Sequence, residues 1–164
     1  MKKENLKEVI SRDAHCFGCS QKNPHGLKMR FYVDDTTIYS WPKVPDHLCG
    51  WDGIVHGGVL STILDEIMSW SAIYNLHRVV MTKTMTVDFF KPVFTADALR
   101  VEGRVIEQIS EREVIVEGKI YKDDDLLCAQ SRGTFAVFTA KAVKRMKIMP
   151  PEVLEGFGDL LDLE

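Results

Sequence analysis

The fold of this chain follows from one segment, Ile54-Val55-His56-Gly57-Gly58-Val59-Leu60-Ser61-Thr62-Ile63-Leu64-Asp65-Glu66-Ile67. From Gly57 to about Asn75 the sequence has helical periodicity, and apolar residues surround nearly the whole circumference of the expected helix. A helix that is apolar on most sides belongs in the interior of a protein. One side carries small and polar residues at three- and four-residue spacing, namely Gly58, Ser61, Thr62, Asp65, Ser69 and Ala72. We therefore expect another part of the structure to approach that side closely.

The start of this helix combines two features that indicate chemistry. Gly57 and Gly58 expose main-chain N–H groups where the unpaired donors and the positive end of the helix dipole favour negative charge. Such a position can hold an oxyanion. Asp65 follows two turns later, and a carboxylate in an apolar segment is costly unless it is paired, protonated or used in a reaction. Together they predict chemistry on an activated carbonyl group.

The composition excludes several classes of protein. The 164 residues are 45% hydrophobic, which suits one domain with a sizeable core. The net charge is −3 and the basic residues are scattered, so we expect no nucleic-acid partner. No apolar run reaches membrane-spanning length, and the first five residues lack the apolar core of a signal peptide. These features predict a soluble, cytoplasmic protein that does not bind a membrane.

A possible metal site lies near the start of the chain. Cys16 and Cys19 form a Cys-x-x-Cys pair, with His15 before it and His25 after it. The next cysteine is Cys49, thirty residues further on, and a lone pair of this kind is a weak signal. We therefore predict reduced thiols, no metal site and no cofactor.

Pattern changes along the chain predict three regions. Residues 1–26 form an N-terminal extension with a short amphipathic start that suits one or two helical turns. Residues 27–140 form the main domain, and residues 141–164 form a peripheral C-terminal tail. Residues 42–53 are expected to be a loop, since prolines and glycines interrupt them.

Six strands are expected around the central helix. Two precede it as a hairpin and four follow it, with turns short enough to make neighbours antiparallel. Their approximate ranges are 27–33, 36–41, 79–93, 98–109, 113–121 and 126–138. A long apolar helix beside such strands is best buried when the sheet curls around it. The predicted class is α+β, with a six-stranded antiparallel sheet wrapped around one long central helix.

These elements and several motifs resemble a known family. The motifs are Val55-His56-Gly57-Gly58-Val59, Leu64-Asp65-Glu66, the strand from Thr82 to Pro92, and Cys16-Phe17-Gly18-Cys19. Over roughly residues 15–140 the chain is similar to the hotdog-fold acyl-CoA thioesterases, including PaaI-like and THEM-like members. The resemblance implies the hotdog fold, thioester hydrolysis, and sites at a dimer interface, with dimers often pairing into tetramers.

The helix geometry also predicts a dimer. Gly57 and Asp65 are eight residues apart, hence about 12 Å apart along the helix axis. One carbonyl group cannot contact both. Two copies packed antiparallel about a twofold axis would bring the Asp65 of one near the Gly57 of the other. We therefore expect a homodimer that binds acyl-CoA.

The chemistry then assigns roles to the motif residues. Gly57, together with Gly58, would polarise the thioester carbonyl, and Asp65 would act as general base or nucleophile. His56 would orient the helix start or transfer a proton. The resemblance adds Thr82 for substrate or water placement, and Thr84 is expected on the same strand face. Glu66 is expected to point toward the sheet or solvent.

The walls of the site suggest the substrate. The candidate acyl-pocket residues, which suit a medium-chain or aromatic acyl group, are Leu60, Trp70, Tyr74, Met81 and Phe89.

Alternatives stay open at the level of sequence. His47 with Asp65 would suit a hydratase or dehydratase of enoyl or 3-hydroxyacyl thioesters. Asp52 or His47 would also be able to position the attacking water. A hotdog protein that binds acyl-CoA without catalysis is the remaining possibility.

Overall fold

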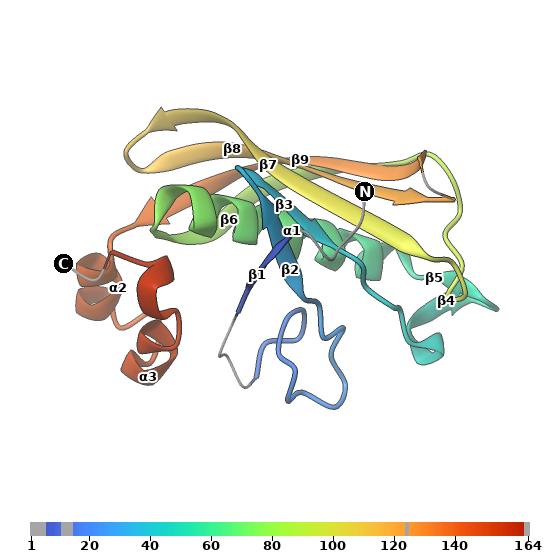
Figure 1. Ribbon diagram of the computed structural model, residues 1–164, viewed down its shortest axis with the longest axis horizontal. Helices are drawn as coiled ribbons and strands as arrows, with labels where there is room; N and C mark the ends of the chain where they lie inside the picture. Colours follow the sequence, from blue (N-terminus) through green and yellow to red (C-terminus); the bar gives the residue numbers. More distant parts are fainter. Residues whose placement is uncertain (1–5, 11–14, 124, 163–164) are drawn as a thin grey trace.

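The computed structural model describes residues 6–10, 15–123 and 125–162. A seven-stranded antiparallel sheet lies on one side of a single long helix, α1 (Gly57–Leu76) (Figure 1). The strand order is β1-β2-β3-β7-β8-β9-β6. The strands are β1 (Lys7–Val9), β2 (Phe31–Asp34), β3 (Thr37–Ser40), β6 (Val79–Phe89), β7 (Leu99–Ser110), β8 (Glu113–Lys122) and β9 (Leu126–Phe138).

The sheet holds one strand more than the sequence predicts. The extra strand is β1, which pairs with β2 through Lys7 opposite Val33 and Val9 opposite Phe31. The expectation of helical turns here was wrong, because three residues carry little periodicity of their own and pairing with a distant strand decides their conformation. The predicted loop before α1 also contains structure, namely η2 (Asp46–Leu48) and a hairpin of β4 (Cys49–Trp51) and β5 (Ile54–Val55).

The core forms between α1 and the inner face of the sheet. Ile63, Leu64, Ile67 and Met68 on the helix are fully buried, as are Val101, Val116, Ile120 and Phe135 on the strands. Helix and sheet approach closely at Gly103, where a Cβ atom would lie 2.5 Å from the Ser71 hydroxyl. The small residue at this contact is Ser71, which is not among those expected to permit a close approach, so the contact lies on another side of α1.

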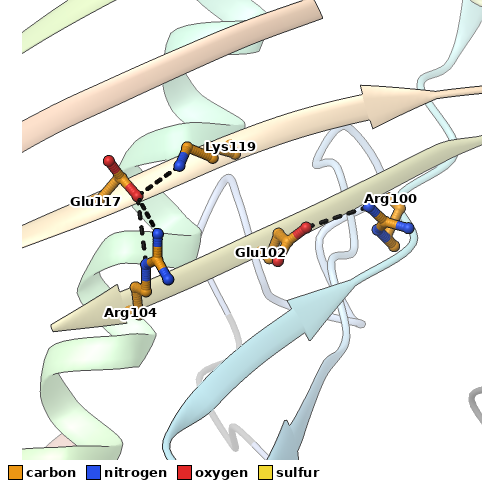
Figure 2. A network of polar contacts seen from close by, with 5 residues as sticks. All are labelled: Arg100, Glu102, Arg104, Glu117 and Lys119. Atoms are coloured by element: carbon orange, nitrogen blue, oxygen red, sulfur yellow. Dashed lines mark hydrogen bonds and ion pairs between the residues drawn. The ribbon is translucent and has the colours of Figure 1, made fainter. Parts of the chain in front are cut away.

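The outer face of the sheet carries charge. Side chains of β8 alternate between buried and half-buried, so Val116 and Ile120 face the helix while Glu117 and Lys119 face away. Glu117 pairs with both Arg104 and Lys119 (Figure 2). This alternation fixes which face of the sheet is in contact with α1.

The residues after β9 close one end of the helix. They form α2 (Ala140–Met146), α3 (Pro151–Glu155) and η3 (Gly158–Leu160), drawn in red at one end of the sheet while the β4–β5 hairpin lies at the other (Figure 1). Val143, Leu154 and Leu161 form a small cluster with Ile73 at the end of α1. None of the helices in the described part of the chain combines the length and apolar character needed to cross a bilayer.

Candidate active site

The start of α1 is organised by His56. This residue is the N-cap, with φ −61° and ψ 136°, and its Nδ1 accepts a hydrogen bond of 2.9 Å from the Gly58 N–H. The His56 carbonyl accepts from Val59 and Leu60. Within the described residues, the Gly57 N–H donates to no protein acceptor. Of the two glycines, only Gly57 therefore keeps an amide available to an external oxygen.

A groove opens beside this free amide. Its volume is about 370 Å³, and Gly57, Leu60, Phe89 and Val93 are among the residues that line it. The Val55 N–H donates to the Val93 carbonyl at 2.9 Å, which holds the β5 segment against the chain that follows β6. Phe89 is half exposed at 53%. Gly57, which carries this hydrogen-bond donor, thus lines a largely apolar groove.

The structure places some of the predicted acyl-pocket residues in this groove and the others outside it. Leu60 and Phe89 line this groove. Trp70 instead lies in the core, stacked on Phe31 at 5.1 Å between ring centroids. Tyr74 and Met81 are half-buried and are absent from the groove lining.

Asp65 is held by the sheet. Thr82 on β6 donates from its hydroxyl to Asp65 Oδ1 at 2.6 Å. This bond fixes the carboxylate orientation and leaves its second oxygen for other partners. Asp65 is half-buried, so it remains within reach of solvent and of another molecule.

Thr84 lies on the opposite face of the sheet from Thr82. Thr82 pairs with Phe135, which faces the helix, whereas Thr84 pairs with Thr134, the next residue on β9. The register shifts between Thr82 and Thr84, because the pairing advances by two residues along β6 but by only one residue along β9. The expectation that the two threonines share a face was wrong, because a bulge breaks the period-two alternation.

Glu66 does not point to the sheet or to open solvent, contrary to expectation. It packs under the loop before β2, with Oε1 3.4 Å from Cys16 Sγ. A Cβ atom at Gly18 would lie 2.3 Å from Glu66 Cδ, so a larger residue there would displace the Glu66 side chain. Burial, followed by the neighbouring Cys16, raises the pKa of Glu66 to about 8. Sequence spacing gave no sign of this contact because the loop is 50 residues away.

The other candidate side chains lie elsewhere. His47 on η2 lines a separate groove of about 480 Å³ with Lys28 and Arg30. Asp52 is exposed in the turn between β4 and β5. Neither residue lines the groove at Gly57.

Comparison with known proteins agrees with this arrangement. Residues 52–129, which include Gly57, Asp65 and Thr82, match the sequence model of the thioesterase superfamily. This segment is similar to the thioesterase superfamily. Its long helix against an antiparallel sheet is the hotdog fold, as the resemblance implied.

Solved structures share the architecture of this chain. The PaaI protein of Escherichia coli, from the phenylacetic acid degradation operon, superposes with a TM-score of 0.62 at 19% identity, covering 68% of this chain and 80% of that one. The protein smu.793 of Streptococcus mutans, solved bound to acetyl CoA, has a TM-score of 0.62 at 18% identity and covers 67% of this chain and 88% of that one. At these identities the likeness concerns the fold.

Curated relatives are more similar in sequence, over about half of this chain. The chain is 33% identical over 79 residues to the acyl-coenzyme A thioesterase THEM4 of Xenopus laevis, covering 48% of this chain and 35% of that protein. It is 34% identical over 88 residues to SSO1253 of Saccharolobus solfataricus, whose assigned name is that of an esterase, covering 52% of this chain and 57% of that protein. The chain thus spans between about a third and just over half of the length of these relatives.

Proposed function

We propose that this protein hydrolyses acyl-CoA thioesters. The observation that carries the proposal is the free Gly57 N–H, which opens onto an apolar groove at the start of the buried helix. A thioester carbonyl bound in that groove would accept the hydrogen bond, and the bond would strengthen as the oxygen gains charge in the transition state. The acyl-CoA thioesterase name of the Xenopus relative and the acetyl CoA bound to the Streptococcus structure support this substrate class.

Asp65 would supply the second part of the reaction. As a general base it would take a proton from water, whose oxygen attacks the thioester carbon while the carbon–sulfur bond breaks. The CoA thiolate would leave and take up that proton. As a nucleophile, Asp65 would form a mixed anhydride that water then opens. In both cases the bond from Thr82 would hold the carboxylate in position.

The site would be completed by a second copy of the chain. Within one protomer Gly57 and Asp65 lie on the same helix, about 12 Å apart along its axis. β6, which carries Thr82, is an edge strand of the sheet, and Phe89 and Phe90 are exposed at its end. An exposed strand edge with apolar side chains is a surface that proteins cover. We expect a homodimer, with further pairing into a tetramer possible on the same scaffold.

Release of free thiol from a panel of acyl-CoA substrates tests the reaction. Medium-chain and aromatic acyl groups should be cleaved best, because the groove is apolar and of moderate volume. Asp65→Asn should lower kcat by about 10²- to 10⁴-fold while the fold is retained, because the shape stays and the proton acceptor is lost. Asp88→Asn, at an exposed position of β6, is the matched control and should leave kcat unchanged.

Three outcomes would overturn the proposal. Undiminished cleavage by Asp65→Asn would remove the base or nucleophile from the mechanism. Hydration of crotonyl-CoA without release of thiol would assign the site to a hydratase. Tight binding of acyl-CoA with neither reaction would leave a binding protein.

A further inference from the structure

Cys16, Cys19 and Glu66 form a compact cluster that the proposed hydrolysis does not use. Their ligand atoms all lie within 4.8 Å of one another. The two Sγ atoms are 3.1 Å apart, and Cys16 Sγ is 3.4 Å from Glu66 Oε1. The cysteines come from the loop before β2 and the carboxylate comes from α1, so the cluster joins two separate parts of the fold.

The loop geometry favours a thiolate at Cys16. The Cys19 N–H points at Cys16 Sγ from 3.3 Å, and the loop is fastened by the bonds from Leu27 N–H to the Phe17 carbonyl and from Met29 N–H to the Gly18 carbonyl. A backbone N–H directed at sulfur stabilises the deprotonated form, which is the form that binds metal ions. The close fit of Gly18 against Glu66 keeps the carboxylate beside the two sulfur atoms.

The distances approach those of a tetrahedral site. With metal–sulfur bonds of about 2.3 Å and metal–oxygen bonds of about 2.0 Å, ligand atoms in a tetrahedron lie about 3.5 to 3.8 Å apart. The sulfur–oxygen distance of 3.4 Å already agrees with this geometry. The two sulfur atoms, now 3.1 Å apart, would have to move only slightly further from each other. Three protein donors leave one position for a water molecule.

The charges at the cluster are those of a cation site. All three side chains are acids, and Glu66 takes part in none of the ion pairs within the described residues. Buried carboxylates and thiolates are stable when a cation neutralises them. Two soft sulfur ligands favour Zn²⁺ over Mg²⁺ or Ca²⁺.

We propose that Cys16, Cys19 and Glu66 bind one Zn²⁺ ion, which fastens the loop before β2 to the central helix. The ion would lie beside the turn that carries Asp65, so it would hold the helix at that turn. This site differs from the one weighed on the sequence, because the third donor is Glu66 of the helix. His25, the candidate there, is exposed and lies outside the cluster.

Cobalt substitution tests the proposal directly. The full-length protein would be reduced, stripped with a chelator and titrated with Co²⁺, which gives a charge-transfer absorption when thiolates coordinate it. We expect one equivalent per chain and displacement by Zn²⁺. Cys16→Ser and Cys19→Ser should abolish the absorption, and Glu66→Gln should weaken binding at least about tenfold. Cys49→Ser is the matched control, since Cys49 is exposed and outside the cluster.

Circular dichroism of each variant separates loss of metal binding from loss of the fold. The titration of the wild-type protein remains a valid test even if a variant fails to fold. No thiolate absorption in folded, reduced wild type would overturn the proposal. Equal Co²⁺ affinity in wild type and Glu66→Gln would overturn the ligand assignment. A Cys16–Cys19 disulfide in protein isolated without reductant, with no metal binding after reduction, would assign the pair to dithiol chemistry instead.

Discussion

At the scale of single residues, His56 determines which amide at the helix start is free. Its ring accepts a hydrogen bond from the Gly58 N–H, and its carbonyl accepts hydrogen bonds from the N–H groups of Val59 and Leu60. Among the described residues at the helix start, the Gly57 N–H is therefore the one that has no protein acceptor. This difference between the two glycine amides depends on the N-cap position, since a side chain there reaches the N–H two residues ahead. His56 thereby supports the helix as well as the proposed oxyanion position.

His56→Ala should lower the free energy of unfolding by about 1 kcal/mol, because the Gly58 N–H loses its acceptor. His56→Asn should restore most of that loss, since asparagine is a strong N-cap. Urea denaturation of both variants measures the effect. Equal stability of His56→Ala and wild type would show that the ring bond contributes nothing.

Single residues also show how far reasoning from the sequence reaches. Gly57 and Asp65 stand out in the sequence because a glycine and a carboxylate are each unusual in an apolar helix. Glu66 violates it equally, yet its partners Cys16 and Cys19 come from a loop that no local pattern brings to α1. The family resemblance pointed to Thr82 for water or substrate placement but not to its bond with Asp65. The different face of Thr84 depends on a bulge that the threonine alternation conceals.

At the scale of elements, β7, β8 and β9 were predictable because their residues alternate and short turns join them. β1 was not, since it is three residues long and is formed only by pairing with β2. The β4–β5 hairpin contains two glycines that suggested a loop. Long elements carry their own signal, and short ones depend on distant partners.

The charged outer face of β7 and β8 gives a pH-dependent prediction. Burial raises the pKa of Glu117, but Lys119 and Arg104 outweigh burial and hold that pKa below its ordinary value (Figure 2). The carboxylate therefore stabilises the fold above the pKa of the unfolded chain, about 4.3, and the contribution is lost as pH falls through the lower folded value.

Glu117→Gln should cost about 1 kcal/mol of unfolding free energy near neutral pH, and this difference from wild type should shrink toward zero in acid. Thermal unfolding across a pH series measures both. Glu111→Gln is the control, since Glu111 is exposed and takes part in no ion pair among the described residues. A difference that persists unchanged in strong acid would contradict the ion-pair origin.

At the scale of the whole molecule, the proposed activity depends on pairing of two chains, and this can be separated from the chemistry. Gly57→Pro removes only the N–H, because position 57 is the first of the helix and His56 already has the extended backbone that precedes proline. It should lower kcat by about 10²- to 10³-fold. Gly57→Ala keeps the N–H, and its Cβ would meet Phe89 at an ordinary 3.7 Å, so it should stay active.

Mixed dimers then report where the two halves of a site come from. A dimer of one Asp65→Asn chain and one Gly57→Pro chain would hold one intact site, formed by Gly57 of the first and Asp65 of the second. Random pairing should restore about a quarter of wild-type activity, since half of the dimers are mixed and each has one intact site of two. Unfolding and refolding the two variants together, followed by the thiol-release assay, measures this. Refolding each alone is the control. No recovery, with light scattering showing a mixed dimer, would place both groups of a site in one chain and contradict the shared arrangement.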